Sequence, residues 1–255
     1  MFDERYEVFL AENETARQIH HKVRYQVYCL EEGFEDQNDF DDNQERDEWD
    51  DRSAHFTVRD KRSGDWVAAM RIILPGPEAL PIEEMCHIEH AEIPPSDSIA
   101  EISRLCIVDK CRRKNQSDSF SQKHDTTYPH LVKSSQPPAA KERAHKSEII
   151  LGLLRAAVDY SYENGISNWY FLTKPALARI INRLCIQLSK VGSPCNHRGV
   201  RYPFSANLRT AERQATAGSS VIAQWRNSTI KSYRRYSELN SPAPNTLDED
   251  LVAYG

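Results

Sequence analysis

Hydrophobic and polar residues alternate in four short runs of the N-terminal half, a pattern typical of β-strands. These runs cover residues 6–10, 54–59, 66–74 and 99–108. The turn at residues 61–65 is short enough to join the second and third runs as an antiparallel hairpin. The pattern predicts a sheet that begins with largely antiparallel neighbours.

The hydrophobic period becomes helical over residues 14–30, between the first two strands. Asn13 stands directly before this segment as a predicted N-cap. Apolar residues form a stripe on one face, and Arg24 and Tyr28 fall one turn apart on a neighbouring face. Spacing alone leaves Arg24 open between a solvent-exposed helix arginine and a residue of a site.

Further helices and strands are predicted in the C-terminal half. Helical spacing covers residues 150–158 and stops at residues 164–165, where Asn-Gly favours a helix end. The apolar run at 169–173 predicts a buried strand, Pro175 fits the first turn of another helix, and residues 192–204 hold one or two more strands. This order predicts an α/β fold with a mixed, mostly antiparallel central sheet flanked by helices.

The predicted elements lie in one domain, residues 1–215. Residues 112–141 are polar, rich in proline and serine and without a period, so we expect a disordered insertion there. Residues 216–255 are rich in small and polar side chains and predict a C-terminal helix with a frayed tail.

Composition bears on three questions: nucleic-acid binding, the state of the cysteines and the cellular compartment. The net charge of −5 gives no general case for nucleic-acid binding. The six cysteines include no Cys-x-x-Cys pair, which favours reduced thiols over a metal site. The N-terminus resembles no secretory signal, and no run of 18 apolar residues occurs. We therefore expect a cytoplasmic protein without a transmembrane segment.

An acidic segment follows the first predicted helix. Residues 31–51 hold twelve carboxylates and one arginine, which predicts a loop. The loop also contains Phe34, Phe40 and Trp49, which suggests that it folds over an apolar site as a lid. Its acids do not follow the spacing of a calcium-binding loop, so we expect no metal there.

Ionisable residues occur inside the predicted strands. Arg71 lies in the third strand, and the fourth strand carries Glu101, Ser103 and Arg104. Buried charges need partners, because each unpaired one costs roughly several kcal/mol. In a regular strand Glu101 and Arg104 face opposite sides, so they serve one site only if the strand bulges or the sheet splays there.

These residues and the order of elements resemble the acyl-homoserine-lactone synthase branch of the GNAT acyltransferase superfamily. Within that branch the likeness is closest to acyltransferases associated with PEP-CTERM/exosortase systems and to N-acyl amino acid synthases. It is strongest in residues 23–35 and 45–47. The resemblance covers residues 5–108 well and 145–205 loosely, and it rests on an ordered set: Arg24, Tyr28, Phe34, Asp47, Trp49, Asp50, Arg71, Glu101, Ser103 and Arg104.

The resemblance implies a GNAT-like fold in which the sheet splays near strand four and forms an acyl-chain tunnel. It also implies transfer of a fatty acyl group from acyl carrier protein, or from acyl-CoA, to an amine, with no bound cofactor. The catalytic candidates are Glu101 as general base, with Ser103 and Arg104. The substrate-binding candidates are Arg24, Tyr28, Phe34, Asp47, Trp49, Asp50 and Arg71. Members usually have Phe and Trp where this chain has Tyr28 and Phe34, so the acceptor is expected to differ from that of a lactone synthase.

The donor is indicated by the segment after strand four. Residues 108–115 lack the glycines with which CoA-dependent GNAT enzymes wrap a pyrophosphate. Cations there suit an acidic carrier protein, although they could also merely solubilise the insertion. The candidate docking residues are Lys110, Arg112, Arg113 and Lys114.

The expected function is transfer of an acyl group to the amine of an amino acid or similar small molecule. One alternative is an acyl-homoserine-lactone synthase that uses S-adenosylmethionine. Another is an ordinary CoA-dependent acetyltransferase, which the missing glycines disfavour. A third, from a different class, is a non-catalytic module that binds acyl carrier protein.

Overall fold

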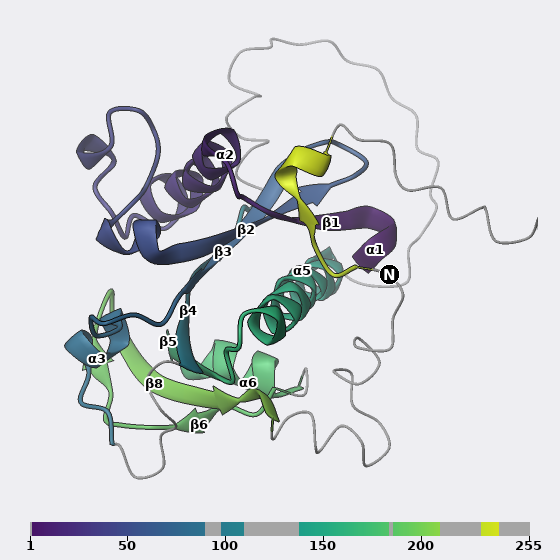
Figure 1. The fold of residues 1–255 in the computed structure, drawn as a ribbon. Coiled ribbons are helices and arrows are strands. Elements are labelled where there is room, and N and C mark those ends of the chain that lie inside the picture. The colour runs from purple at the N-terminus through teal and green to yellow at the C-terminus, as the bar shows by residue number, and fades with distance from the viewer. Residues whose placement is uncertain (1, 90–97, 110–137, 184–185, 210–230, 240–255) are drawn as a thin grey trace, which may run out of the picture.

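The computed structural model describes residues 2–89, 98–109, 138–183, 186–209 and 231–239 (Figure 1). The strands are β1 (Tyr6–Leu10), β2 (Ser53–Asp60), β3 (Trp66–Ile73), β4 (Ile99–Ile107), β5 (Asn168–Thr173), β6 (Ser189–Lys190), β7 (Cys195–Asn196), β8 (Val200–Asn207) and β9 (Arg234–Arg235). The α-helices are α1 (Phe2–Arg5), α2 (Glu14–Tyr25), α3 (Pro81–Met85), α5 (Pro138–Glu163) and α6 (Pro175–Arg183). Short π- and 3₁₀-helical segments are η1 (Gln26–Glu31), η2 (Gln37–Asp39), η3 (Glu48–Arg52) and η6 (Tyr236–Glu238).

The strands form one open, mixed sheet. Its order is β6-β8-β5-β4-β3-β2-β1-β9, with β7 paired to β8. The β4–β5 and β1–β9 pairs are parallel and the other pairs are antiparallel. The predicted mixed, mostly antiparallel sheet is therefore confirmed.

Helices α2 and α5 cover opposite faces of this sheet (Figure 1). On β3, Met70 and Ile72 belong to the main hydrophobic core with α5, whereas Ala69 packs with Val23 and Val27 on the α2 side. Strand alternation explains this division, because consecutive side chains point to opposite faces.

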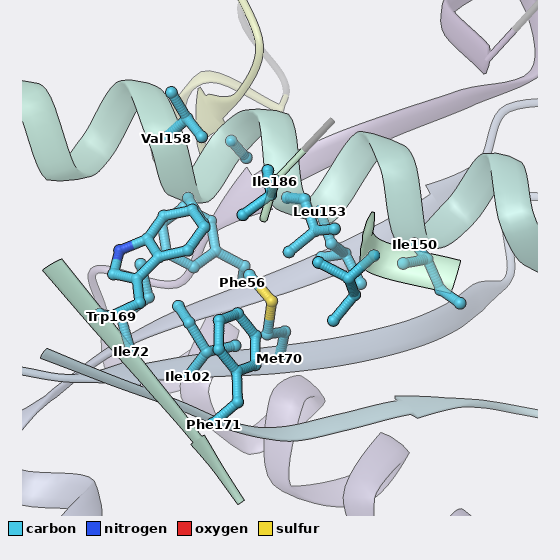
Figure 2. Packing of buried hydrophobic residues seen from close by; sticks show 14 of the residues in the cluster. Phe56, Met70, Ile72, Ile102, Ile150, Leu153, Val158, Trp169, Phe171 and Ile186 are labelled. Carbon is cyan, nitrogen blue, oxygen red and sulfur yellow. The ribbon is translucent and has the colours of Figure 1, made fainter. Parts of the chain in front are cut away.

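The main core lies between the sheet and the helices α5 and α6 (Figure 2). Trp169 of β5 is fully buried in it, and its indole Nε1 donates to the Ser161 hydroxyl at 2.9 Å. Leu153 of α5 and Phe56 of β2 are buried in the same cluster. Burial of such side chains is worth about 1.5–3 kcal/mol each, which makes this layer a rigid support for β4 and β5.

The sheet splits beside β4. Pairing between β4 and β5 runs from Ile99 to Ile102, and further along the chain β5 no longer pairs with β4. At the same point the β3–β4 register shifts, and Arg104 has a φ of +50°. A bulge with a non-glycine residue at positive φ re-aims the side chains around it. In a regular strand Glu101 and Arg104 would face opposite sides, and the bulge allows both to face one site.

Most predicted elements are present, with three differences at their ends. The helix predicted at residues 14–30 is an α-helix only to Tyr25 and continues as the π-helical η1. Helix α5 begins at Pro138, so residues 138–141 of the expected insertion are helical. Residues 231–239 contain β9 and η6 in the region where we expected a helix and tail. Residues 112–137, 216–230 and 240–255 lie outside the described residues.

The expectation that all cysteines are reduced was wrong for one pair. Cys86 and Cys195 form a disulfide with a Cα–Cα distance of 5.7 Å, whereas Cys29 and Cys106 are free and buried. The two bonded residues are 109 apart in sequence and meet because their segments are bridged by strand-like pairing nearby. Sequence spacing carries no signal for such a contact. Among the described residues, no helix is long and apolar enough to cross a membrane.

Candidate active site

A cavity of about 610 Å³ opens where β4 and β5 diverge. Residues 101–107 of β4 and 171–173 of β5 contribute to its wall, as do residues 45–49 of the acidic segment. The volume lies in the range of small-molecule sites. The predicted site residues that line it are Tyr28, Phe34, Asp47, Trp49, Arg71, Glu101, Ser103 and Arg104.

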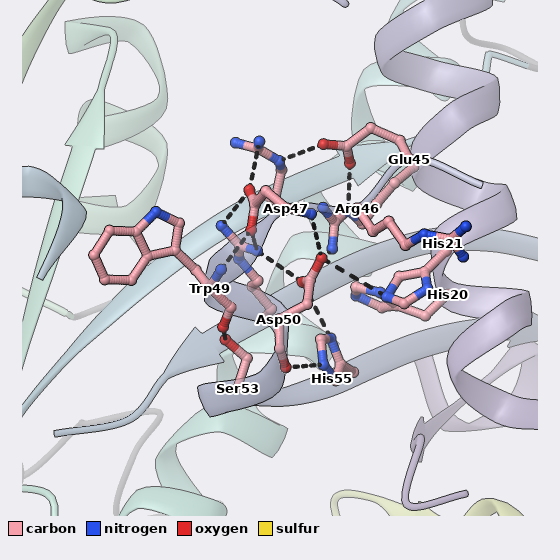
Figure 3. A network of polar contacts seen from close by, with 12 residues as sticks. His20, His21, Glu45, Arg46, Asp47, Trp49, Asp50, Ser53 and His55 are labelled. Carbon is pink, nitrogen blue, oxygen red and sulfur yellow. Dashed lines mark hydrogen bonds and ion pairs between the residues drawn. The ribbon is translucent and has the colours of Figure 1, made fainter. Parts of the chain in front are cut away.

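Three arginines and three carboxylates form an ionic cluster on one side of the cavity: Arg24, Arg71, Arg104, Glu45, Asp47 and Asp50. The acidic members and their neighbours are seen in Figure 3. The cluster is charge-balanced, which is the condition under which ionised groups tolerate burial.

Arg24 and Asp50 form the buried base of the ionic cluster. Arg24 is 0 % exposed, and it donates to Glu45 and to Asp50 at 2.5 Å each. Neither Arg24 nor Asp50 belongs to the cavity wall. Both residues were expected to bind substrate. Their position allows them to hold Arg71 and Glu45, which do reach the wall.

Arg71 and Arg104 connect this base to the cavity. Arg71 donates to Asp50 at 2.7 Å, to Asp47 at 2.9 Å and, through Nε, to the Ser103 hydroxyl at 2.9 Å. Arg104 donates to Asp47 at 2.8 Å and to Glu45 at 3.1 Å. The bulge turns Arg104 toward the ionic cluster, so both arginines approach one wall of the cavity.

Arginine pairing fixes the charge of the two aspartates. Burial by itself raises the pKa of Asp50, but Arg24 and Arg71 overcome it, and that pKa lies well below its usual range. Burial likewise opposes ionisation of Asp47, and hydrogen bonds from Arg71 bring its pKa below the ordinary value. Both carboxylates are therefore ionised at neutral pH and act as fixed charges.

Glu101 lies in the same cavity but in a different environment. It is 3 % exposed, and its Oε2 accepts the backbone N–H of Ile82, in α3, at 2.9 Å. Burial raises its pKa to about 7, although the Ile82 N–H, Arg71 and Arg104 oppose the shift. A carboxyl group that titrates near neutral pH can take and return a proton, as general acid–base catalysis requires.

Aromatic side chains form another part of the wall. Tyr28 donates its hydroxyl to the Leu105 carbonyl at 3.4 Å, and its ring centroid lies 6.3 Å from that of Phe34. The Arg104 guanidinium lies 5.5 Å from the Tyr28 ring. Phe40 and Trp49 of the acidic segment also line the cavity, in agreement with a loop that folds over an apolar site.

The structure adds residues that sequence reasoning missed as members of the site. Glu45 bridges Arg24 and Arg104. Glu35 bridges Arg104, at 3.7 Å, and Arg198 of the β7–β8 turn. Twelve acids in one segment gave no signal to single out Glu45 or Glu35. Arg198 lies far along the chain and could be placed only by the fold. The predicted docking residues Lys110, Arg112, Arg113 and Lys114 lie outside the described residues.

The chain resembles a known domain family and several solved structures. Residues 23–122 match the family model described as an acetyltransferase (GNAT) domain. Among solved structures, the acyl-homoserine-lactone synthase LasI is 20% identical, with 85% of this chain and 95% of that chain covered and a TM-score of 0.55. No curated protein matches the chain.

Two further structures share the fold. The CoA-dependent acyl-homoserine lactone synthase BjaI is 15% identical, covering 87% of this chain and 98% of its own at a TM-score of 0.52. FeeM, an N-acyl amino acid synthase from uncultured soil microbes, is 11% identical, covering 87% and 97% at a TM-score of 0.51. This chain has a GNAT fold. The GNAT domain match supports an acyltransferase, and the solved structures show the fold.

Proposed function

We propose that this GNAT protein transfers a fatty acyl group from acyl carrier protein, or from acyl-CoA, to the amine of an amino acid or similar small molecule. The observation that carries the proposal is Glu101, a buried carboxyl group with a pKa of about 7 in the cavity where β4 and β5 part. A strand split leaves room for an acyl chain, and a carboxyl group of this kind suits deprotonation of an amine.

The reaction needs one proton to leave the amine as it attacks the thioester carbonyl. Glu101 accepts that proton, directly or through one water. The new N–C bond forms, the C–S bond breaks, and the leaving thiolate takes up a proton. Backbone N–H groups of β4 beyond Ile102, where β5 has turned away, supply hydrogen bonds to the developing oxyanion. The chain's own groups suffice, so no bound cofactor is required.

The charged wall accounts for an amino acid as acceptor. Asp47 offers a negative partner near the ammonium group before deprotonation, while Arg201 lines the cavity and can pair with a carboxylate. Arg71 and Arg104 already contact carboxylates of the protein. They and Arg198, which pairs with Glu35, therefore act mainly by holding the wall in place, and the acceptor's carboxylate is better matched to Arg201 of β8.

The proposed donor is acyl carrier protein. The segment after β4 has no glycine turn for a pyrophosphate, and its cations Lys110, Arg112, Arg113 and Lys114 suit an acidic protein surface. Such a reaction belongs in the cytoplasm, where acyl carrier protein is acylated. An association with PEP-CTERM/exosortase systems fits the same residue pattern.

The test compares wild type with Glu101→Gln in thiol release from purified acyl-acyl carrier protein and acyl-CoA, with a mixture of amino acids as acceptors. Mass spectrometry identifies the N-acyl products. We expect a loss of turnover of about 100-fold or more in Glu101→Gln. The control is Glu84→Gln, which alters an exposed glutamate of α3, the helix whose Ile82 N–H contacts Glu101. If Glu101→Gln turns over within a few-fold of wild type, Glu101 is not the general base.

An acyl-homoserine-lactone synthase is the second candidate, because LasI and BjaI share the fold over most of their length. The same assay with S-adenosylmethionine as acceptor separates the two functions. A lactone product with release of methylthioadenosine identifies the synthase, whereas an acylated amino acid identifies the proposed enzyme. Carrier-protein binding with no thiol release from either donor favours the non-catalytic module.

A further inference from the structure

Three histidines are buried together behind the ionic cluster. His20 and His21 come from α2 and His55 from β2, and they are 0 %, 8 % and 2 % exposed. One ring nitrogen from each lies within 4.8 Å of the others. Figure 3 shows the three rings grouped beside Asp50. Three imidazoles in a buried position are costly unless their nitrogens are used.

Hydrogen bonds define which nitrogens are available. His20 Nε2 lies 3.3 Å from the Met70 carbonyl, and His55 Nε2 lies 3.0 Å from the Asp50 carbonyl. A carbonyl only accepts, so each Nε2 carries the hydrogen and each neutral ring keeps a lone pair on Nδ1. This arrangement, with one nitrogen held by a backbone carbonyl and the other free, is how proteins orient histidine ligands for a metal.

The free nitrogens have no other use among the described residues. His20 Nδ1, His21 Nε2 and His55 Nδ1 are buried side-chain atoms without a hydrogen-bond partner there. The Asp50 carboxylate oxygens lie 3.8 Å from His21 Nε2 and 3.9 Å from His55 Nδ1. Burial lowers the pKa of all three histidines, to about 4 for His55, so the rings are neutral at pH 7.

We propose that His20, His21 and His55 bind one divalent transition-metal ion of the zinc type, with the Asp50 carboxylate as the fourth ligand. Three imidazoles and one carboxylate form a donor set that zinc accepts. A tetrahedral zinc ion with bonds of about 2.0–2.1 Å sets its ligand atoms about 3.3 Å apart. The three histidine nitrogens lie within 4.8 Å of one another, and Asp50 lies 3.8 Å from His21 and 3.9 Å from His55, so binding requires these side chains to move inward by less than a bond length.

The ion has a structural role in this position. It joins α2 to β2 on the sheet face that α2 covers, and it contacts Asp50, the carboxylate that Arg71 also contacts. The Arg24 guanidinium repels the ion, but Glu45 and Asp50 neutralise that guanidinium. A closed set of four protein ligands leaves no open position for substrate, so the ion supports the ionic cluster and takes no part in acyl transfer.

The experiment uses the full-length chain after treatment with a chelator. Co²⁺ is titrated into the protein, and the visible absorption of tetrahedral cobalt reports the stoichiometry. We expect one equivalent to bind, to be displaced by Zn²⁺, and to raise the melting temperature as the metal concentration rises. His55→Gln and His21→Gln should bind Co²⁺ at least 100-fold more weakly. The matched control His87→Gln, which changes an exposed histidine, should bind like wild type.

Circular dichroism checks that each variant is folded before titration. If a variant does not fold, the wild-type titration and its melting temperature still decide the question. The proposal is overturned if folded wild type binds well below one equivalent at micromolar Co²⁺. It is also overturned if His55→Gln and His21→Gln bind as tightly as His87→Gln, because the ion then lies elsewhere.

Discussion

Asp50 and Glu101 are both buried carboxyl groups of the candidate active site, yet their pKa values shift in opposite directions. Asp50 is 9 % exposed and contacts two arginines, and its pKa lies well below the ordinary value. Glu101 is 3 % exposed and accepts a backbone N–H, and its pKa rises to about 7. Burial acts in the same direction on both groups, so the partners decide the difference.

The comparison distinguishes two roles of carboxyl groups at one cavity, a structural role and a proton-transfer role. Paired carboxylates keep their charge and fix the positions of arginines, whereas a carboxyl group with little compensation can change its charge during a reaction. The protein places the first kind in an acidic loop that folds onto α2 and β3, and the second kind on a strand beside α3. The bulge at Arg104 lets both kinds reach the cavity.

The largest expected effect comes from removing a central partner of the paired region. Arg24→Met leaves Glu45 and Asp50 without their shared buried cation, and we expect the free energy of unfolding to fall by about 3–5 kcal/mol. Urea denaturation followed by circular dichroism measures it. Arg46→Met is the matched control, because Arg46 is 53% exposed and pairs with Asp42 on the surface. It should change stability by less than about 1 kcal/mol. Equal losses of unfolding free energy in the two variants would contradict a stabilising role of Arg24 in the buried ionic cluster.

The pH dependence of stability tests the other carboxyl group. The pKa of Glu101 rises from 4.5 in the unfolded chain to about 7 in the folded protein. The folded state therefore binds more protons between these pH values, and stability falls as pH rises through this window. Glu101→Gln cannot ionise and so does not lose this stability. Above pH 7 the variant should therefore be more stable than wild type by up to about 3 kcal/mol.

Urea denaturation at pH 5, 6, 7 and 8 measures this difference. Glu84→Gln should follow wild type at every pH. Asp50 contributes with the opposite sign, because its folded pKa is depressed: its stabilisation is present above its unfolded pKa of 3.8 and is lost as pH falls below that value. A Glu101→Gln difference that stays constant from pH 5 to pH 8 would show that Glu101 does not titrate in this range.

The fold could be predicted from the sequence because most of its helices and strands have a local pattern of hydrophobic and polar residues. The alternation at residues 66–74 and the proline at Pro175 needed no partner to be interpreted. The bulge at Arg104 could not be located, because it arises from the register between β3 and β4. β9 was missed for the same reason: two residues, Arg234–Arg235, become a strand only by pairing with β1.

The site was predictable where a charge stood inside an apolar strand. Arg71 and Glu101 were identified this way, and both line the cavity. Glu45 was not, since nothing in a row of acids distinguishes the one that becomes buried. His55 was missed for a related reason, because a single histidine in a strand gives no sign of two others packed against it from α2.

The smallest expected effect concerns Ser103, which lies between the two regions. Its hydroxyl accepts from Arg71 Nε at 2.9 Å, and it is two residues from Glu101. Ser103→Ala removes that neutral acceptor while Asp47 and Asp50 still bind the guanidinium, so we expect a stability loss of about 1 kcal/mol. Turnover should fall less than tenfold, because the serine positions Arg71 and does not move the amine's proton. Ser63→Ala, in the β2–β3 turn, is the matched control for both measurements. A loss of turnover as large as that of Glu101→Gln, with an unchanged KM, would instead place the Ser103 hydroxyl in the proton path and make it a catalytic group.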